Sequence, residues 1–175
     1  MKKILLDGNE VKTLAPESLP MLIHGADGSG ASLYTICLAA KWFSQGNKII
    51  FLCGYPMAEQ EFKQQVGTEH TSAKFYTQDK VNEFIEELRD ATKDTIVIVK
   101  NIELFDDNLF DATKDVNNLI ISGAIGKSVI KKQLLSKKFT TEVYFSSLDG
   151  KDVIRLDKYQ GYVISSNHKG ITQLL

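Results

Sequence analysis

The sequence of 175 residues is poor in proline, cysteine and arginine. It has three prolines and two cysteines, Cys37 and Cys53, so it contains no proline-rich linker, disulfide framework or CxxC metal motif. Arginine occurs only at Arg89 and Arg155, so few side chains offer the planar fork of donors that grips a phosphate. No apolar run reaches the roughly 20 residues of a membrane-spanning helix, and residues 4–6 are too few for a signal peptide. We expect a cytoplasmic protein with two reduced, buried thiols and no membrane partner.

The charges of the chain nearly cancel. Lysine and arginine total 21, and aspartate and glutamate total 22, which leaves a formal net charge of −1 at pH 7. This balance gives no whole-molecule field that would attract nucleic acid or an anionic membrane, although it allows a local basic patch. Hydrophobic residues make up 43% and charged residues 25%, as in ordinary globular proteins. We predict one domain over residues 1–175, with residues 1–19 as an extension that contains a hairpin turning at Asp7 and Gly8.

From residue 20 onward, short apolar runs alternate with amphipathic segments. Apolar strands separated by helices are typical of a parallel sheet covered on both faces. The sequence therefore predicts an α/β fold, a largely parallel sheet with helices on both faces and a C-terminal β-hairpin within residues 162–174. The expected strands are 21–24, 48–53, 73–76, 95–99, 118–122 and 141–146, and the expected helices are 32–45, 57–65, 81–92, 106–115 and 127–138. The expected sheet core is Leu22, Ile23, Ile50, Leu52, Ile96, Ile98, Leu119, Ile121, Val143 and Phe145.

The most informative motif follows the first strong strand. Residues 25–32, GADGSGAS, lead from that strand into a helix, and a phosphate-binding P-loop has the pattern GxxxxGK[ST] in the same setting. Gly25, Gly30 and Ser32 stand at the required spacing, whereas position 31 holds alanine in place of lysine. Glycines let backbone N–H groups curl around phosphate oxygens, and the helix N-terminus adds positive potential. The motif favours P-loop ancestry, and the alternative is a glycine-rich turn that binds no ligand.

A second glycine-rich turn, residues 123–128 (GAIGKS), contains the Gly-Lys-Ser that the first one lacks. Its glycines, Gly123 and Gly126, are too close together to leave enough N–H groups for wrapping a phosphate. We interpret Lys127 and Ser128 as the ordinary start of a helix.

With the loop at 25–32 in this position, residues 20–175 resemble the RecA/KaiC-like family of P-loop ATPases. The strand 95–99 resembles the strand that carries the family's Walker B aspartate, and the final hairpin resembles the one with which the family commonly ends. The resemblance implies a RecA-like fold, a site for ATP or another phosphate-containing ligand, and side-by-side assembly with other protein subunits. The candidate nucleotide-binding residues are Gly25, Asp27, Gly28, Ser29, Gly30, Ala31, Ser32 and Lys100.

Three positions depart from the family's pattern. Ala31 replaces the P-loop lysine, Gly54 or Tyr55 stands where the family has its catalytic glutamate, and Lys100 stands where it has the Walker B aspartate. The lost groups would place charge on the phosphates, activate water and support the Mg²⁺ shell. We therefore expect no catalytic residue, no metal site and little or no hydrolysis. If the strands 48–53 and 95–99 are aligned wrongly with those of the family, a carboxylate comes instead from Glu59, Glu61, Glu103 or Asp106.

Lys100 is expected beside the glycine-rich loop, at the end of a central strand. A buried ammonium needs a partner, and we expect it to pair with a neighbour such as Asp27 in an empty site. The alternative is that Lys100 binds a phosphate itself, in place of both the lost lysine and Mg²⁺. Anion binding would then be independent of magnesium.

The expected helix 127–138 is basic and amphipathic, with Val129, Ile130, Leu134 and Leu135 facing inwards. Its five lysines could contact nucleic acid or an acidic partner. No arginine or aromatic residue interleaves with them, so we favour a solvated helix face. The lysines are Lys127, Lys131, Lys132, Lys137 and Lys138.

We expect a pseudo-ATPase that acts as a scaffold or regulatory subunit in a homo- or hetero-oligomer. The alternative is a working ATPase or nucleotide-binding switch of the RecA/KaiC type, such as one in DNA processing. The discriminating feature is whether a carboxylate lies within reach of Ser32.

Overall fold

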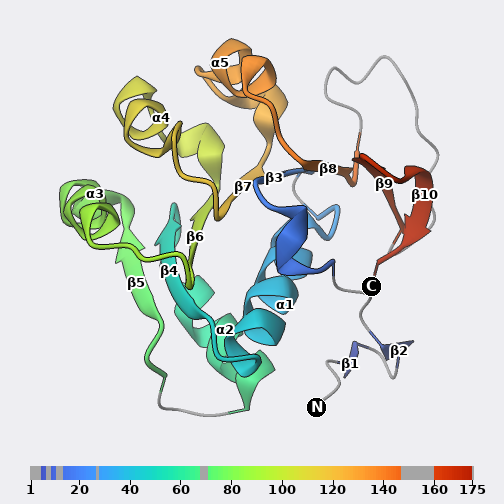
Figure 1. The fold of residues 1–175 in the computed structure, drawn as a ribbon, viewed down its shortest axis with the longest axis horizontal. Helices are drawn as coiled ribbons and strands as arrows, with labels where there is room; N and C mark the ends of the chain where they lie inside the picture. Colours follow the sequence, from blue (N-terminus) through green and yellow to red (C-terminus); the bar gives the residue numbers. More distant parts are fainter. Residues whose placement is uncertain are drawn as a thin grey trace.

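The structure is a computed structural model that describes residues 5–6, 9–10, 14–26, 28–67, 71–146 and 160–174. Its principal feature is an eight-stranded sheet with the strand order β10-β9-β8-β3-β7-β6-β4-β5 (Figure 1). The strands are β3 (Met21–His24), β4 (Lys48–Cys53), β5 (Lys74–Thr77), β6 (Thr95–Lys100), β7 (Leu119–Gly123), β8 (Thr141–Tyr144), β9 (Gln160–Ser165) and β10 (Lys169–Gln173).

The sheet is parallel from β5 to β8 and antiparallel only at the other edge, where β9 and β10 form a hairpin. Helices cover both faces (Figure 1). On one face lie α1 (Ala31–Ser44) and α2 (Ala58–Val66), and on the other lie α3 (Val81–Arg89), α4 (Asp107–Thr113) and α5 (Lys131–Ser136). The predicted α/β class, with its largely parallel sheet and C-terminal hairpin, is confirmed.

Strand side chains alternate between two hydrophobic layers. In the central strand β6, Ile96 and Ile98 join the cluster beneath α1 and α2, whereas Val97 and Val99 join the cluster on the opposite face. All ten residues predicted for the sheet core are buried. Both faces of these strands are covered, which explains why the sequence runs are continuously apolar.

The basic segment differs from its prediction. The chain forms a 3₁₀ helix at Ile125–Lys127 and becomes extended at Ser128, and α5 begins only at Lys131. The Ser128 hydroxyl accepts a hydrogen bond from the N–H of Ile130 at 3.3 Å, so the serine side chain competes with a continuous helix. The later start changes which side chains face inwards, and Val129 is 77% exposed and Leu135 45% exposed. Of the four residues expected to face inwards, Ile130 and Leu134 are buried.

Smaller differences concern the ends of elements. The helix expected to reach residue 92 ends at Arg89. Near the start of the chain, β1 (Leu5–Leu6) and β2 (Asn9–Glu10) pair in antiparallel fashion, as the expected hairpin requires. Asp7 and Gly8 of the expected turn lie outside the described residues.

Among the helices that the structure describes, none has the length and apolar character needed to cross a membrane.

Candidate functional site

A cavity of about 530 Å³ opens at the carboxyl ends of β3, β6 and β7, between α1 and α2. The carboxyl edge of a parallel sheet is where α/β proteins commonly bind ligands. Six of the eight predicted site residues line it: Gly25, Gly28, Gly30, Ala31, Ser32 and Lys100. Ser29 belongs to the same turn without lining the cavity, and Asp27 lies outside the described residues.

The glycine-rich turn ends where α1 begins. Gly30 has φ of 96°, a left-handed conformation that glycine adopts without the steric cost of a side chain. The first helical hydrogen bond runs from the N–H of Tyr34 to the carbonyl of Gly30, at 2.9 Å. The N–H groups of Ser32 and Leu33 precede that bond, and both residues line the cavity. The positive end of α1 therefore borders the cavity.

Neighbouring strands brace the turn. The N–H of Gly25 donates to the carbonyl of Gly123 at 3.1 Å, and the N–H of Ala26 donates to the Ser146 hydroxyl at 3.0 Å. A Cβ added to Gly25 would lie 2.2 Å from Ser29 Oγ. The Cβ of Ala31 would lie only 2.5 Å away and cannot rotate aside, so position 25 requires a glycine.

Lys100 ends β6 and is 7% exposed. Its Nζ lies 3.3 Å from Oε2 of Glu61, which α2 carries into the cavity wall. The expectation of a paired lysine at this place is confirmed, and among the described residues its partner is Glu61. The suggested partner, Asp27, is outside the described residues, and the carboxylate that the structure places beside Lys100 is that of Glu61.

Two buried polar atoms at the floor of the cavity have no hydrogen-bond partner among the described residues: Ser122 Oγ and Asn101 Oδ1. Ser122 is 1% exposed and pairs with Lys100 in the register of β6 and β7. Ser122 and Lys100 each follow an apolar run. Their side chains lie on the face of the sheet that α1 covers, as those of Ile98 and Ile120 do. Sequence reasoning missed Ser122, although a polar residue that ends a buried strand was a usable signal.

Two of the four alternative carboxylates share the cavity with Ser32. Glu61 and Glu103 line it, and Glu103 Oε2 accepts a hydrogen bond from the N–H of Ala124 at 2.9 Å. Gly123 makes this approach feasible, because a Cβ there would lie 2.3 Å from Glu103 Oε2.

The other two carboxylates have separate roles. Glu59 forms an ion pair with Lys63 one turn along α2, at 2.8 Å. Asp106 caps α4 by accepting a hydrogen bond from the N–H of Asn108 at 3.2 Å. Neither residue lines the cavity.

The two cysteines are buried and not bonded to each other. Burial raises the pKa of Cys37 to about 11 and that of Cys53 to about 12, although the charge of Lys100 opposes the shift at Cys53. Neither thiol is therefore activated as a nucleophile. Across the part of the chain that the structure describes, no three His, Cys, Asp or Glu side chains gather as a metal site would require.

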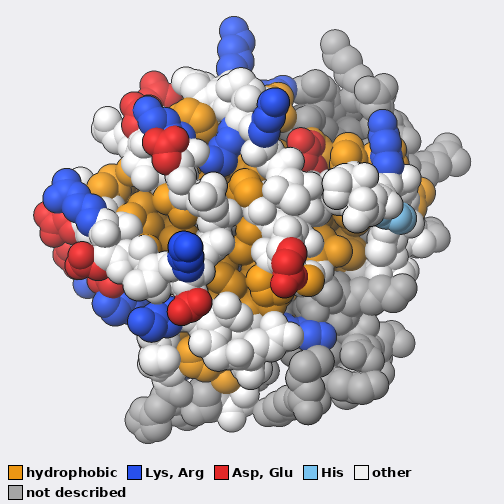
Figure 2. Space-filling view, in the orientation of Figure 1, with side chains coloured by type: hydrophobic (Ala, Val, Ile, Leu, Met, Phe, Trp, Pro, Cys, Tyr) orange, Lys and Arg blue, Asp and Glu red, His pale blue; other side chains and the backbone are white. Residues whose placement is uncertain are grey.

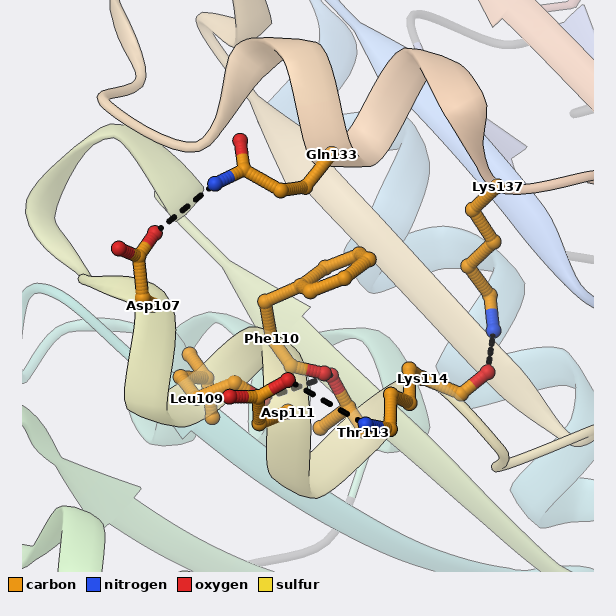
Figure 3. A network of polar contacts seen from close by, with 8 residues as sticks. All are labelled: Asp107, Leu109, Phe110, Asp111, Thr113, Lys114, Gln133 and Lys137. Atoms are coloured by element: carbon orange, nitrogen blue, oxygen red, sulfur yellow. Dashed lines mark hydrogen bonds and ion pairs between the residues drawn. The ribbon is translucent and has the colours of Figure 1, made fainter.

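The lysine-rich segment is partly structural. Lys137 reaches from the end of α5 to the carbonyl of Lys114, and Gln133 donates to Asp107 Oδ1 at 3.2 Å, so both side chains tie α5 to α4 (Figure 3). Burial lowers the pKa of Lys137, and the charge of Asp115 opposes that shift. Figure 2 shows lysines and carboxylates intermixed over this face, a mixture of charges unlike a basic track for nucleic acid.

No family model fits the sequence, and no curated protein is significantly similar to it.

Proposed function

We propose that this protein is a RecA-like P-loop domain that has lost hydrolysis and serves as a scaffold or regulatory subunit of an assembly. Its cavity would still take a phosphate-containing ligand, without Mg²⁺. The fold class supports this proposal through the glycine-rich turn between β3 and α1 and through the antiparallel hairpin at the sheet edge.

The observation that carries the proposal is the place of Lys100. Its ammonium lies at the floor of the cavity that also contains Ser32, where a P-loop enzyme would need a metal-supporting carboxylate. A buried ammonium repels Mg²⁺, and position 31 offers only a methyl group in place of the phosphate-binding lysine. The remaining donors are suited to holding an anion and lack the means to activate water.

Exposed apolar side chains at the cavity rim support an assembled state. Tyr55 is 57% exposed and Met57 is 61% exposed, and both line the cavity. Exposed apolar side chains that form a contiguous patch are typical of a surface that another protein covers. Light scattering across a range of protein concentrations tests this, and Met57→Glu should shift the protein towards smaller species.

Hydrolysis is tested directly. Purified protein should release phosphate from ATP and GTP no faster than buffer does, with Mg²⁺ present. Ser32→Ala is the control, because a contaminating ATPase would be unaffected by that change. Turnover that requires Mg²⁺ and disappears in Ser32→Ala would refute the proposal.

One observation favours the second candidate, a working ATPase or nucleotide-binding switch. Glu61 and Glu103 line the same cavity as Ser32, so carboxylates are present near the position where a metal-bound phosphate would lie. Under this alternative, Glu103→Gln would abolish the turnover that the first proposal says is absent. The same phosphate-release assay therefore separates the two functions.

A further inference from the structure

We propose that the Glu61 carboxylate competes with a phosphate group for Lys100. In the free protein Glu61 forms an ion pair with Lys100, and a phosphate group that binds Lys100, Ser122 and the start of α1 displaces it. This inference deepens the proposed function and rests on its claim that the cavity takes a phosphate group without Mg²⁺. It adds a regulator of that site from within the chain.

The ion pair is asymmetric. The Lys100 side chain is 9% exposed and belongs to a central strand, whereas the Glu61 side chain is 39% exposed and lies on a covering helix. Their separation of 3.3 Å exceeds the roughly 2.7–2.9 Å of a strong charge-assisted hydrogen bond. The cation is therefore fixed and the carboxylate is displaceable, because a loose pair with an exposed acid contributes little.

Three kinds of donor lie around Lys100, although the carboxylate of Glu103 and the acceptor atom Asn101 Oδ1 share the cavity. Ser122 Oγ is buried with no hydrogen-bond partner among the described residues, which is costly for a hydroxyl unless a ligand accepts a hydrogen bond from it. The N–H groups of Ser32 and Leu33 border the same cavity. An ammonium, a hydroxyl and helix N–H groups together match an oxyanion with several acceptor oxygens, such as a phosphate group. The single carboxylate of Glu61 satisfies only part of this set.

The Glu61 side chain can move away from Lys100 while α2 stays in place. The next residue, Phe62, is 0% exposed and packs edge-on against Phe51 and Phe43, with ring centroids 5.6 Å and 5.4 Å away. This anchor holds α2 on α1 while the Glu61 side chain rotates towards solvent. Competition between ligand and carboxylate then requires only a change of side-chain rotamer.

Calorimetry with inorganic phosphate and with pyrophosphate, in EDTA, tests the inference. Glu61→Gln should bind both anions roughly three- to tenfold more tightly than the wild type, because the competing charge is gone. Glu59→Gln is the matched control: it removes the same charge from the same helix, but its carboxylate pairs with Lys63 and does not line the cavity. Its affinity should stay within about twofold of the wild type.

A double-variant cycle assigns the effect to Lys100. Lys100→Met should lose anion binding, and adding Glu61→Gln to it should restore nothing. An equal gain in the Lys100→Met background, an equal gain in Glu59→Gln, or no binding of phosphate to any variant would overturn the inference. Circular dichroism of each variant establishes that the fold is retained.

The two proposals fail in different ways. Magnesium-dependent turnover of ATP refutes the loss of hydrolysis and leaves the effect of Glu61→Gln on phosphate affinity intact. Absence of turnover together with unchanged phosphate affinity in Glu61→Gln refutes the competition alone.

Discussion

The ring of His24 accepts a hydrogen bond at Nδ1 from the N–H of Ile125, at 3.0 Å. A backbone N–H can only donate, so Nδ1 carries a lone pair in the folded state. The bond joins the end of β3 to the turn that follows β7, two segments separated by 101 positions. His24 is 3% exposed, and its role is therefore to hold together the two strands that border the cavity.

Replacing His24 by leucine removes this acceptor and leaves the buried N–H of Ile125 without it. We expect His24→Leu to lower the free energy of unfolding by about 1–3 kcal/mol. His168 is exposed, so His168→Leu should change it by less than about 0.5 kcal/mol. Urea denaturation measures both, and equal losses in the two variants would contradict the structural role of His24.

Because the two thiols are buried, we predict that the free energy of unfolding falls at alkaline pH. In the folded protein the pKa values of Cys37 and Cys53 are raised from 9.0 to about 11 and about 12. Below pH 9 both states hold the protons, and stability is unaffected. As the pH rises above 9, the unfolded chain releases these protons first and is stabilised. Each thiol then lowers the free energy of unfolding by about 1.4 kcal/mol per pH unit until its folded pKa is reached.

Urea denaturation between pH 8 and pH 11 measures this slope. The variant Cys37→Ala/Cys53→Ala should have a shallower decline over the same range, since it lacks both groups. An unchanged slope in that variant would contradict the assignment.

The corrected orientation of α5 is tested by neighbouring leucines. Leu134 is 0% exposed and Leu135 is 45% exposed. Leu134→Ala should lower the free energy of unfolding by about 2–5 kcal/mol, because it leaves a cavity in the core. Leu135→Ala should cost less than about 1 kcal/mol. Equal costs would restore the longer helix expected from the sequence.

Most of the fold could be predicted because its strands are buried on both faces. The run at residues 96–99 is apolar without interruption, and such a run is characteristic of a central parallel strand. The α5 region could not be predicted as well. Val129 is apolar and fits the helical spacing, but the Ser128 hydroxyl interrupts the helix before it, and the sequence pattern does not weigh that competition.

The candidate site could be predicted in part. The spacing of Gly25, Gly30 and Ser32 identified the turn, and the apolar run before Lys100 placed the ammonium beside it. The partner of Lys100 depends on how α2 lies across the sheet, which is a matter of long-range packing. For that reason the sequence left Glu61 among four alternative carboxylates.

Substitution of Gly123 tests the close approach between β7 and the chain that follows β6. It has φ of 141°, and a Cβ there would lie 2.9 Å from the backbone nitrogen of Ile102, as well as against Glu103. Gly123→Ala should therefore lower the free energy of unfolding by at least about 2 kcal/mol. At Gly170 the nearest atom to an added Cβ is His168 Nε2, at 3.8 Å, so Gly170→Ala serves as the control and should cost under about 1 kcal/mol. Thermal unfolding followed by circular dichroism compares the two, and a smaller loss in Gly123→Ala would contradict the packing.

Lys137 and Lys138 are adjacent, but Lys137 has a structural role whereas Lys138 is solvated. Lys137 donates to the carbonyl of Lys114 and lies 5.9 Å from the Phe139 ring centroid, whereas Lys138 is exposed. Lys137→Ala should lower the free energy of unfolding by about 1 kcal/mol, and Lys138→Ala should change it by less than about 0.5 kcal/mol. Chemical denaturation of both variants decides this, and a larger loss for Lys138→Ala would reverse the assignment.

Because both native thiols are buried and have raised pKa values, the folded chain presents no readily ionised sulfur to an alkylating reagent. A cysteine introduced at the exposed position of Val129 would therefore be modified selectively, with the native cysteines left in place. Val129 lies just before α5, and α5 covers the face of the sheet opposite α1 and α2. A fluorescent dye attached there would follow tumbling and assembly of the whole molecule from a residue that does not line the cavity.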